Sequence, residues 1–214
     1  MSCTSHTRST AKLRLKAAIL LFLFVVLTGA SVDTEASPTQ SKTATFAGGC
    51  FWCVEHLFDE VEGVISTVSG YTDGEVENPT YSNVSAGHTG HTEAVQVVFD
   101  PTQVSYDQLL TLFWRNIDPT TPNQQFCDHG SQYRSAIFFH SDEQKKQALD
   151  SLNALQNNKP FTADIVTEIK PNKPFFPAEE YHQDYHHKNP IRYRFYRHSC
   201  GRDQRLKELW GAGK

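Results

Sequence analysis

The chain has 214 residues, of which 38% are hydrophobic and 21% are charged, and its formal net charge is −4. This length and composition fit one globular domain with its own core and exclude a disordered chain. Because basic residues are not in excess, the composition also argues against nucleic-acid binding, and no nucleic-acid partner is expected. A monomer is expected.

Residues 1–36 are expected to be a signal peptide and the start of a tether. Basic residues between Arg8 and Lys16 precede an unbroken apolar stretch, Ala17–Leu27, which is shorter than the roughly 20 residues that span a bilayer. We therefore expect an exported protein, periplasmic or secreted, and an uncleaved membrane anchor is the alternative. Residues 37–42 are predicted to be a linker, and residues 43–214 the folded catalytic domain.

The first half of the folded domain begins with a predicted strand at Thr43–Ala47, which a pair of glycines ends. Apolar residues then recur at helical spacing, which predicts a helix over Cys50–Glu60. β-branched and aromatic residues predict strands at Val64–Tyr71 and Glu93–Phe99. The segment Asn78–His91 between them carries proline, glycine and serine and is predicted to be a loop.

The second half continues the alternation of helices and strands. Ser105 is a favourable N-cap for a helix over Tyr106–Asn116, and Ser141 with Gln144 forms a capping box that opens a helix to about Asn157. The other predicted elements are strands at Gln132–His140 and Asp164–Lys170, irregular segments at 118–130 and 171–190 with one helical turn near Ala178–Tyr185, and a short helix at Asp203–Trp210. This order predicts an α/β fold, built as a two-layer α+β sandwich.

Four cysteines follow the signal segment: Cys50, Cys53, Cys127 and Cys200. In an exported protein four cysteines are able to form a disulfide framework. A domain of this size needs no such staples, however, so catalytic chemistry is weighed at least as heavily as structural bridging.

The segment from Gly48 to Cys53 is the most informative part of the chain. A cysteine that follows a glycine break at a helix N-terminus faces unpaired N–H groups and the positive end of the helix dipole, which both favour the reactive thiolate. Phe51 and Trp52 are suited to wall an apolar pocket for a small group such as a methyl. From these residues alone, the alternative is a buried cysteine beside two core aromatics.

Gly49-Cys50-Phe51-Trp52 resembles the signature of the A-type methionine sulfoxide reductases. Other stretches agree with this family in the same order. They are Gly63-Val64, Ser69-Gly70-Tyr71, Asn78-Pro79-Thr80-Tyr81, Gly90 to Val95, Gly130 to Ser135, Tyr181 to Tyr185 and Lys188-Asn189-Pro190. The resemblance covers about residues 43–212. It implies a mixed sheet with a ferredoxin-like core, and the thiol-dependent reduction of methionine S-sulfoxide, in proteins or free, to methionine.

The resemblance also implies roles for the residues that match the family. Cys50 matches the nucleophile, which becomes a sulfenic acid when methionine is released, and Phe51 and Trp52 match the pocket for the substrate methyl group. The groups expected around the sulfoxide oxygen are Tyr81, Glu93 and Tyr133, with Asp128 at a further active-site acid position. The leaving oxygen needs a proton near neutral pH. A glutamic acid in an apolar pocket is able to supply it, because burial raises its pKa. For each of these residues considered alone there is an alternative without function. Each tyrosine would be an ordinary half-buried aromatic, and Glu93 would be a solvated acid at a strand end.

Ser199-Cys200-Gly201 resembles the C-terminal resolving site of this family. The resemblance implies that Cys200 forms a disulfide with the oxidised Cys50, and that a thioredoxin-like partner then reduces this bond. No cofactor and no metal is expected. Cys53 stands where the family more often has glycine; it is expected to pack as a small apolar residue, with a resolving role as the alternative. Cys127 is expected to be a bystander, or to pair artefactually in an oxidising compartment.

Three other readings stay open at this point. The first is a thioredoxin-like disulfide oxidoreductase that uses Cys50 and Cys53; against it, the usual cis-proline segment is not identifiable and Cys200 has no role. The second is a metal site built from His88, His91 and Glu93, or from His182, His186 and His187, although no closed ligand set follows from their spacing. The third is a secreted binding domain that two disulfides staple.

Overall fold

The computed structural model describes residues 40–211. The predicted signal peptide and residues 37–39 of the predicted linker lie outside the described residues. Within the described range, no helix combines the length and the apolar character that crossing a membrane requires.

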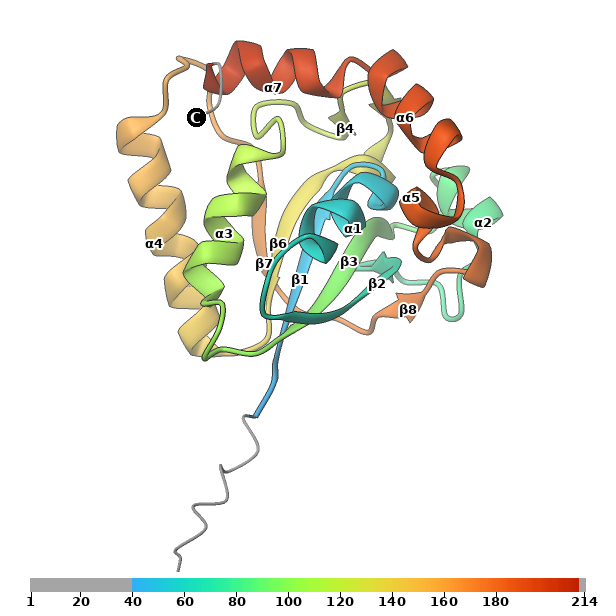
Figure 1. Ribbon diagram of the computed structural model, residues 1–214, viewed down its shortest axis with the longest axis horizontal. Coiled ribbons are helices and arrows are strands. Elements are labelled where there is room, and N and C mark those ends of the chain that lie inside the picture. The colour runs from blue at the N-terminus through green and yellow to red at the C-terminus, as the bar shows by residue number, and fades with distance from the viewer. Residues whose placement is uncertain (1–39, 212–214) are drawn as a thin grey trace, which may run out of the picture. The chain divides into compact units, whose positions relative to one another are not determined.

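A six-stranded mixed sheet is the framework of the domain (Figure 1). In spatial order its strands are β7 (Glu168–Pro171), β6 (Ser135–Phe139), β1 (Lys42–Gly48), β3 (Thr92–Phe99), β2 (Val64–Thr72) and β8 (Phe176–Pro177). β6 and β7 are parallel, and the other neighbouring pairs are antiparallel. The order β6-β1-β3-β2, with a helix after β1 and another after β3, is the βαββαβ arrangement of a ferredoxin-like core. The predicted fold class is therefore confirmed.

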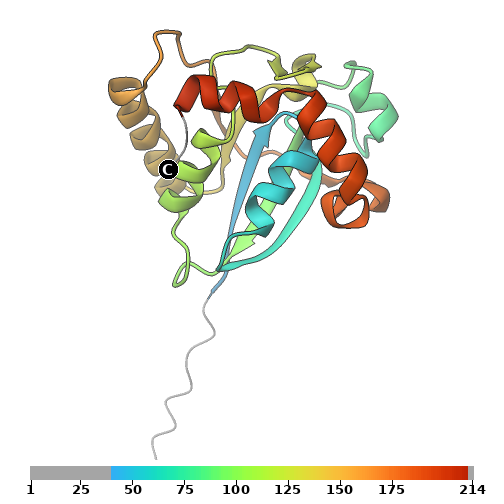
Figure 2. The ribbon, with the colours of Figure 1, turned by 45° about the horizontal axis from the view of Figure 1, so that its top comes forward.

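Three helices cover one face of this sheet: α1 (Phe51–Asp59), α3 (Tyr106–Arg115) and α4 (Asp142–Asn158) (Figures 1 and 2). α1 packs against β1, β2 and β3, whereas α3 and α4 pack against each other, with α3 also on β1 and α4 on β6 and β7. Phe46 from the central strand stacks on Phe58 of α1 at 4.9 Å between ring centroids and on Phe113 of α3 at 5.0 Å. These rings join the helices to the sheet in one apolar core.

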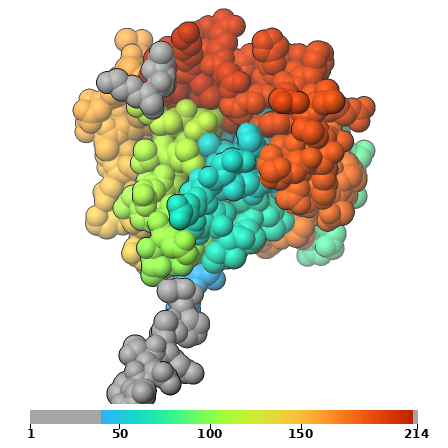
Figure 3. Space-filling view, viewed as in Figure 1, coloured from blue at the N-terminus to red at the C-terminus, as the bar shows by residue number. Residues whose placement is uncertain are grey.

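The C-terminal segment forms three consecutive helices, α5 (Tyr185–Lys188), α6 (Pro190–Ser199) and α7 (Arg202–Trp210). α5 packs against α1, and α6 packs against both α5 and α7. Trp210 Nε1 donates to the Ile117 carbonyl, which ties the end of α7 to the chain just after α3. In the space-filling view α1 is seated between α3 and this C-terminal segment (Figure 3).

The predicted starts of the long helices agree with the structure, and one long helix, α6, was missed. Ser105 and Gln108 form a complete capping box at α3. At α4, Ser141 accepts from the Gln144 N–H, but the Gln144 side chain accepts from the His140 N–H instead of closing the box. No helix was predicted over α6, although Pro190 at its first position is a start signal.

The missed helix has a physical explanation in its burial pattern. Ile191 and Phe195 are 76% and 73% exposed, and the buried Tyr193 lies between them in sequence. α6 therefore lacks the apolar stripe that identifies a core-facing helix.

Other differences concern short elements and strand ends. The predicted strand at Gln132–His140 begins only at Ser135, because a 3-10 turn occupies Ser131–Tyr133, and the strand predicted from Asp164 begins at Glu168. Two short elements lie in segments predicted to be loops: the helix α2 (Tyr81–Ser85), and the hairpin of β4 (Gln124–Gln125) and β5 (Asp128–His129).

Candidate active site

Cys50 lies at the point where β1 passes into α1. Gly49 has a φ of +83°, and a Cβ atom there would come within 2.5 Å of the Gln125 Cβ atom, so no residue with a side chain fits this turn without strain. The turn places Cys50 at the N-cap of α1, where its side chain is enclosed and the residue is 7% exposed.

Glu93 reaches the same helix end from the neighbouring strand. Side chains alternate along β3, so Glu93 shares a face with Val95, Val97 and Phe99, the face that α1 covers. The residue is 2% exposed, and its Oε2 atom accepts a hydrogen bond of 2.9 Å from the Phe51 N–H. Burial raises the pKa of Glu93 to about 8, against the opposing effect of this hydrogen bond. The acid is therefore mostly protonated at pH 7 and has a proton to give.

A cavity of about 60 Å³ opens between these groups. Its lining residues are Cys50, Phe51, Trp52, Tyr81, Glu93, Asp128, Tyr133 and Tyr196. All the predicted site residues except Cys200 line this cavity, although they come from α1, α2, β3, β5 and the 3-10 turn before β6. A larger hollow of about 440 Å³ lies beside Phe139 and Pro171, but it contains no thiol.

The phenol groups around the cavity are held in their protonated form. Burial raises the pKa of Tyr81 to about 12, and it raises the pKa of Tyr133 and Tyr196 further. Each phenol is therefore a hydrogen-bond donor without charge. The Tyr196 hydroxyl donates to Asp128 Oδ2 over 2.5 Å, and burial raises the pKa of Asp128.

Tyr196 is a lining residue that the sequence analysis missed. It lies on α6, the helix that was not predicted. The available signal was the start of a helix at Pro190, which places Tyr196 and Cys200 four residues apart on one side of the helix.

Trp52 is held by an aromatic layer from the C-terminal segment. Its ring stacks on Tyr185 at 3.7 Å between centroids, and its Nε1 atom donates to His182 Nδ1 over 3.1 Å. Burial lowers the pKa of His182, which keeps the ring neutral and able to accept this bond. His182 and Tyr185 were quoted in the family resemblance but received no role there. In this structure they fix the position of the Trp52 ring.

The four cysteines form one disulfide and one pair of free thiols. Cys127 is bonded to Cys200, whereas Cys50 and Cys53 are free and buried. The expectation that Cys127 is a bystander is therefore wrong, and the alternative that it forms a disulfide agrees with the structure. α6 ends beside the β4–β5 hairpin and brings Cys200 to Cys127. The bond between Cys50 and Cys200, which the resemblance implied, is not the one present here.

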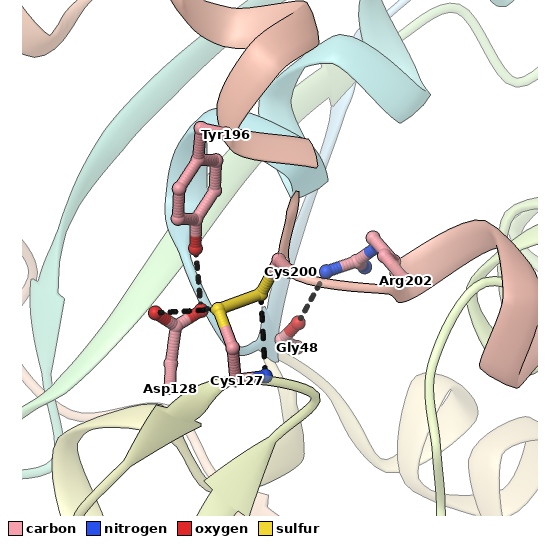
Figure 4. The surroundings of a disulfide bond; sticks show 6 residues. All are labelled: Gly48, Cys127, Asp128, Tyr196, Cys200 and Arg202. Carbon is pink, nitrogen blue, oxygen red and sulfur yellow. Dashed lines mark hydrogen bonds between the residues drawn. A yellow bond between two sulfur atoms is a disulfide. The ribbon is translucent and has the colours of Figure 1, made fainter. Parts of the chain in front are cut away.

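The disulfide adjoins the cavity through Asp128 (Figure 4). The Asp128 carboxylate points at the disulfide, with its oxygen atoms 3.8 Å from the Cys127 sulfur and 4.0 Å from the Cys200 sulfur. The same carboxylate accepts from Tyr196 and lines the cavity with Cys50. Asp128 thus contacts the disulfide and also lines the cavity that contains the free Cys50 thiol.

The protonation of Cys50 differs from the sequence expectation. Burial raises the pKa of the Cys50 thiol, and the hydrogen bond with Cys53 and the nearby acids Glu93 and Asp128 raise it further. That hydrogen bond and the guanidinium group of Arg202 lower the pKa of Cys53. Enclosure and acidic neighbours thus oppose the effect of the helix N-terminus, and Cys50 holds its proton before substrate binds.

The comparisons with known proteins agree on one family. A family model described as "Peptide methionine sulfoxide reductase" matches residues 42–214. The chain is 52% identical over 172 residues to the peptide methionine sulfoxide reductase MsrA of Bacillus licheniformis, and the match covers 80% of this chain and 95% of that protein. Two crystal structures of Mxr1 from Saccharomyces cerevisiae are also similar. The reduced form has a TM-score of 0.68 and 36% identity, covering 72% of this chain and 89% of that one. The complex with Trx2 has a TM-score of 0.50 and 28% identity, covering 70% and 87%.

Proposed function

The chain belongs to the A-type peptide methionine sulfoxide reductases, which are oxidoreductases, and from this membership we propose that Cys50 reduces methionine S-sulfoxide to methionine. The observation that carries the assignment to these residues is the cavity itself. It brings a thiol, a protonated carboxylic acid and neutral phenols together in front of two apolar rings.

In the first step, the sulfur of Cys50 attacks the sulfur of the substrate while Glu93 gives its proton to the sulfoxide oxygen, and the Cys50 thiol proton passes to the Glu93 carboxylate and restores the acid. Tyr81 and Tyr133 donate hydrogen bonds to the same oxygen as it gains negative charge. The bonds from the substrate sulfur to the oxygen and to Cys50 then break, so methionine leaves and the oxygen passes to Cys50 as a sulfenic acid. Two electrons pass from the enzyme thiol to the substrate sulfur, so no other reductant takes part in this step.

The size and lining of the cavity support a substrate that inserts only the tip of its oxidised methionine side chain. The small cavity, of about 60 Å³, suits the end of a side chain such as a methyl sulfoxide group. Phe51 and Trp52 supply the apolar wall for the methyl group. Because recognition is confined to the tip of the side chain, the same site suits oxidised methionine in proteins and peptides as well as the free amino acid.

Cys200 and then Cys127 regenerate the Cys50 thiol. The Cys200 thiol condenses with the sulfenic acid on Cys50, which forms a disulfide and releases water. The Cys127 thiol then attacks the Cys200 sulfur, which frees Cys50 and leaves the Cys127–Cys200 bond. The presence of that bond, the exposure of Cys127 and its contact with the cavity through Asp128 support this order.

A thioredoxin-like dithiol closes the cycle by reducing the Cys127–Cys200 bond. The yeast relative in complex with Trx2 supports this class of partner. The enclosed pair Cys50 and Cys53 is a poor substrate for exchange with another protein, since both residues are buried. This burial opposes the alternative function as a thioredoxin-like disulfide oxidoreductase.

The direct test is an assay on separated sulfoxide epimers with dithiothreitol as the reductant. The S epimer should be reduced and the R epimer left unchanged, and Cys50→Ser should abolish the activity, because a hydroxyl is a far weaker nucleophile. After one turnover without reductant, Cys127→Ser should accumulate a Cys50–Cys200 disulfide that peptide mapping detects. Substantial activity of Cys50→Ser would overturn the assignment, and a Cys50–Cys53 bond in the trapped variant would overturn the proposed route.

The basic and apolar N-terminal segment supports export of the enzyme to the periplasm or beyond the cell, with membrane anchoring if the signal stays uncleaved. Sequencing the N-terminus of the protein recovered from the extracytoplasmic fraction tests this proposal. We also propose that the enzyme acts as a monomer without nucleic acid, which sedimentation at working concentrations tests.

A further inference from the structure

A second cluster of polar side chains lies at the C-terminal end of α1, opposite the end that holds Cys50. Asp59 is the last residue of α1, and His186 and His187 lie on α5. One carboxylate oxygen and two ring nitrogens from these residues lie within 4.8 Å of one another. The Asp59 Oδ2 and His186 Nε2 atoms are 3.6 Å apart. None of the three residues lines the catalytic cavity.

The buried atoms of this cluster lack partners. The His186 side chain is 4% exposed, and neither of its ring nitrogens has a hydrogen-bond partner among residues 40–211. Asp59 Oδ2 is also buried without a partner in that range. Enclosing unpaired polar groups is costly, so this arrangement indicates a missing ligand between them.

We propose that Asp59, His186 and His187 bind a divalent cation of the zinc class. A separation of 3.6 Å is too long for a hydrogen bond, but it is close to the roughly 3.4 Å that separates two ligands of a tetrahedral zinc ion. Two imidazoles and one carboxylate favour Zn²⁺ or Co²⁺ over Ca²⁺ and Mg²⁺. Three protein ligands leave the fourth position to water.

The surroundings of the cluster support this assignment. The Thr67 hydroxyl donates to Asp59 Oδ1, which orients the carboxylate and leaves Oδ2 directed at His186. His186 also has a second possible donor set, with His56 and Glu60. The Glu60 side chain is 66% exposed, so that set is less well built.

A cation at this position would brace the wall of the catalytic cavity. It would connect Asp59 on α1 to the residue that directly follows Tyr185, and Tyr185 stacks on Trp52 at the other end of α1. A metal that binds only the folded chain raises its stability by mass action. Zinc should therefore raise the melting temperature without a change in the chemistry at Cys50.

The test uses the full chain with Co²⁺ as a spectroscopic probe and Zn²⁺ for affinity. Bound Co²⁺ should show visible d–d bands without the near-ultraviolet charge-transfer band that a thiolate ligand produces. Competition with a chromophoric chelator should give a zinc affinity that falls at least about tenfold in Asp59→Asn and in His187→Ala. His187 is exposed, so this variant is expected to fold even if a change at the buried His186 is not tolerated. The matched control is His198→Ala, an exposed histidine that belongs to no candidate donor set among residues 40–211 and to neither histidine cluster considered from the sequence, and this variant should bind zinc as the wild type does.

Three results would overturn the proposal. A thiolate charge-transfer band would place the metal at Cys50 and Cys53 instead. Unchanged zinc affinity in both Asp59→Asn and His187→Ala would remove these residues from the site. A loss of affinity in Glu60→Gln with none in Asp59→Asn would assign the cation to the alternative donor set.

Discussion

Replacement of Glu93 by glutamine is expected to stabilise the fold and to slow the reaction. Burial raises the pKa of Glu93 from its ordinary value of 4.5 to about 8. Between these two values the folded protein holds a proton that the unfolded chain releases, so the stability contributed by this group is lost as the pH rises through the window. Glutamine has the shape of the neutral acid and an oxygen that can accept from the Phe51 N–H, but it never ionises.

The magnitude follows from the width of that window. Each pH unit above 4.5 costs the wild-type fold about 1.4 kcal/mol, until Glu93 ionises in the folded state near pH 8. Relative to its difference from the wild type at pH 4, Glu93→Gln should therefore gain about 3 kcal/mol in free energy of unfolding at pH 7. At pH 9 the gain should approach about 5 kcal/mol.

Urea unfolding of both proteins at pH 4, 7 and 9 measures this difference, and kcat/KM is measured over the same range. The activity of Glu93→Gln should fall by roughly 10²- to 10⁴-fold, with a smaller loss at low pH, where solvent supplies the proton. Wild-type kcat/KM should decline above about pH 8, where the acid ionises. The variant should lack that decline.

Glu55 on α1 supplies a matched control. It is 1% exposed, burial raises its pKa to about 7, and it does not line the cavity. Glu55→Gln should therefore also gain stability above pH 4.5 but retain activity. If the free energy of unfolding of Glu93→Gln differs from that of the wild type by the same amount at pH 4 and pH 9, the pKa of Glu93 is not raised in the folded protein. An activity that is unchanged at every pH would remove Glu93 from proton transfer.

Two further predictions concern the recycling thiol and the turn before Cys50. Cys200→Ser should release a burst of about one methionine per enzyme, then stall with thioredoxin yet continue with dithiothreitol, whereas Cys53→Ser should keep turning over with both reductants. Rapid-quench product counting checks this, and the reverse pattern would assign resolution to Cys53. Gly49→Ala should cost about 1–2 kcal/mol from its left-handed backbone conformation and more from the contact with Gln125, and it should lower activity by shifting Cys50. Gly87→Ala is the control, because Gly87 has a φ of +80° but its added Cβ would make only ordinary contacts. An equal loss of stability in both variants would show that the contact with Gln125 contributes nothing.

Signals contained in neighbouring residues were enough to predict much of the fold. The helix predicted over Cys50–Glu60 is α1 with its two caps, and Ser105 and Ser141 begin the helices that were expected of them. Periodicity and capping are properties of a few adjacent residues, so they can be read without knowledge of the tertiary structure. The same reading placed a cysteine at the N-terminus of α1, and the family resemblance named the residues that surround it.

Only the tertiary structure decided which distant groups meet at the site. The partner of Cys200 is Cys127, 73 residues away, and Tyr196 reaches the cavity on a helix that has no apolar stripe to reveal it. The protonation of Cys50 and Glu93 likewise depends on enclosure by β3, the β4–β5 hairpin and α6. Contacts and desolvation of this kind arise when segments far apart in sequence pack together, and no local pattern of residue types encodes them.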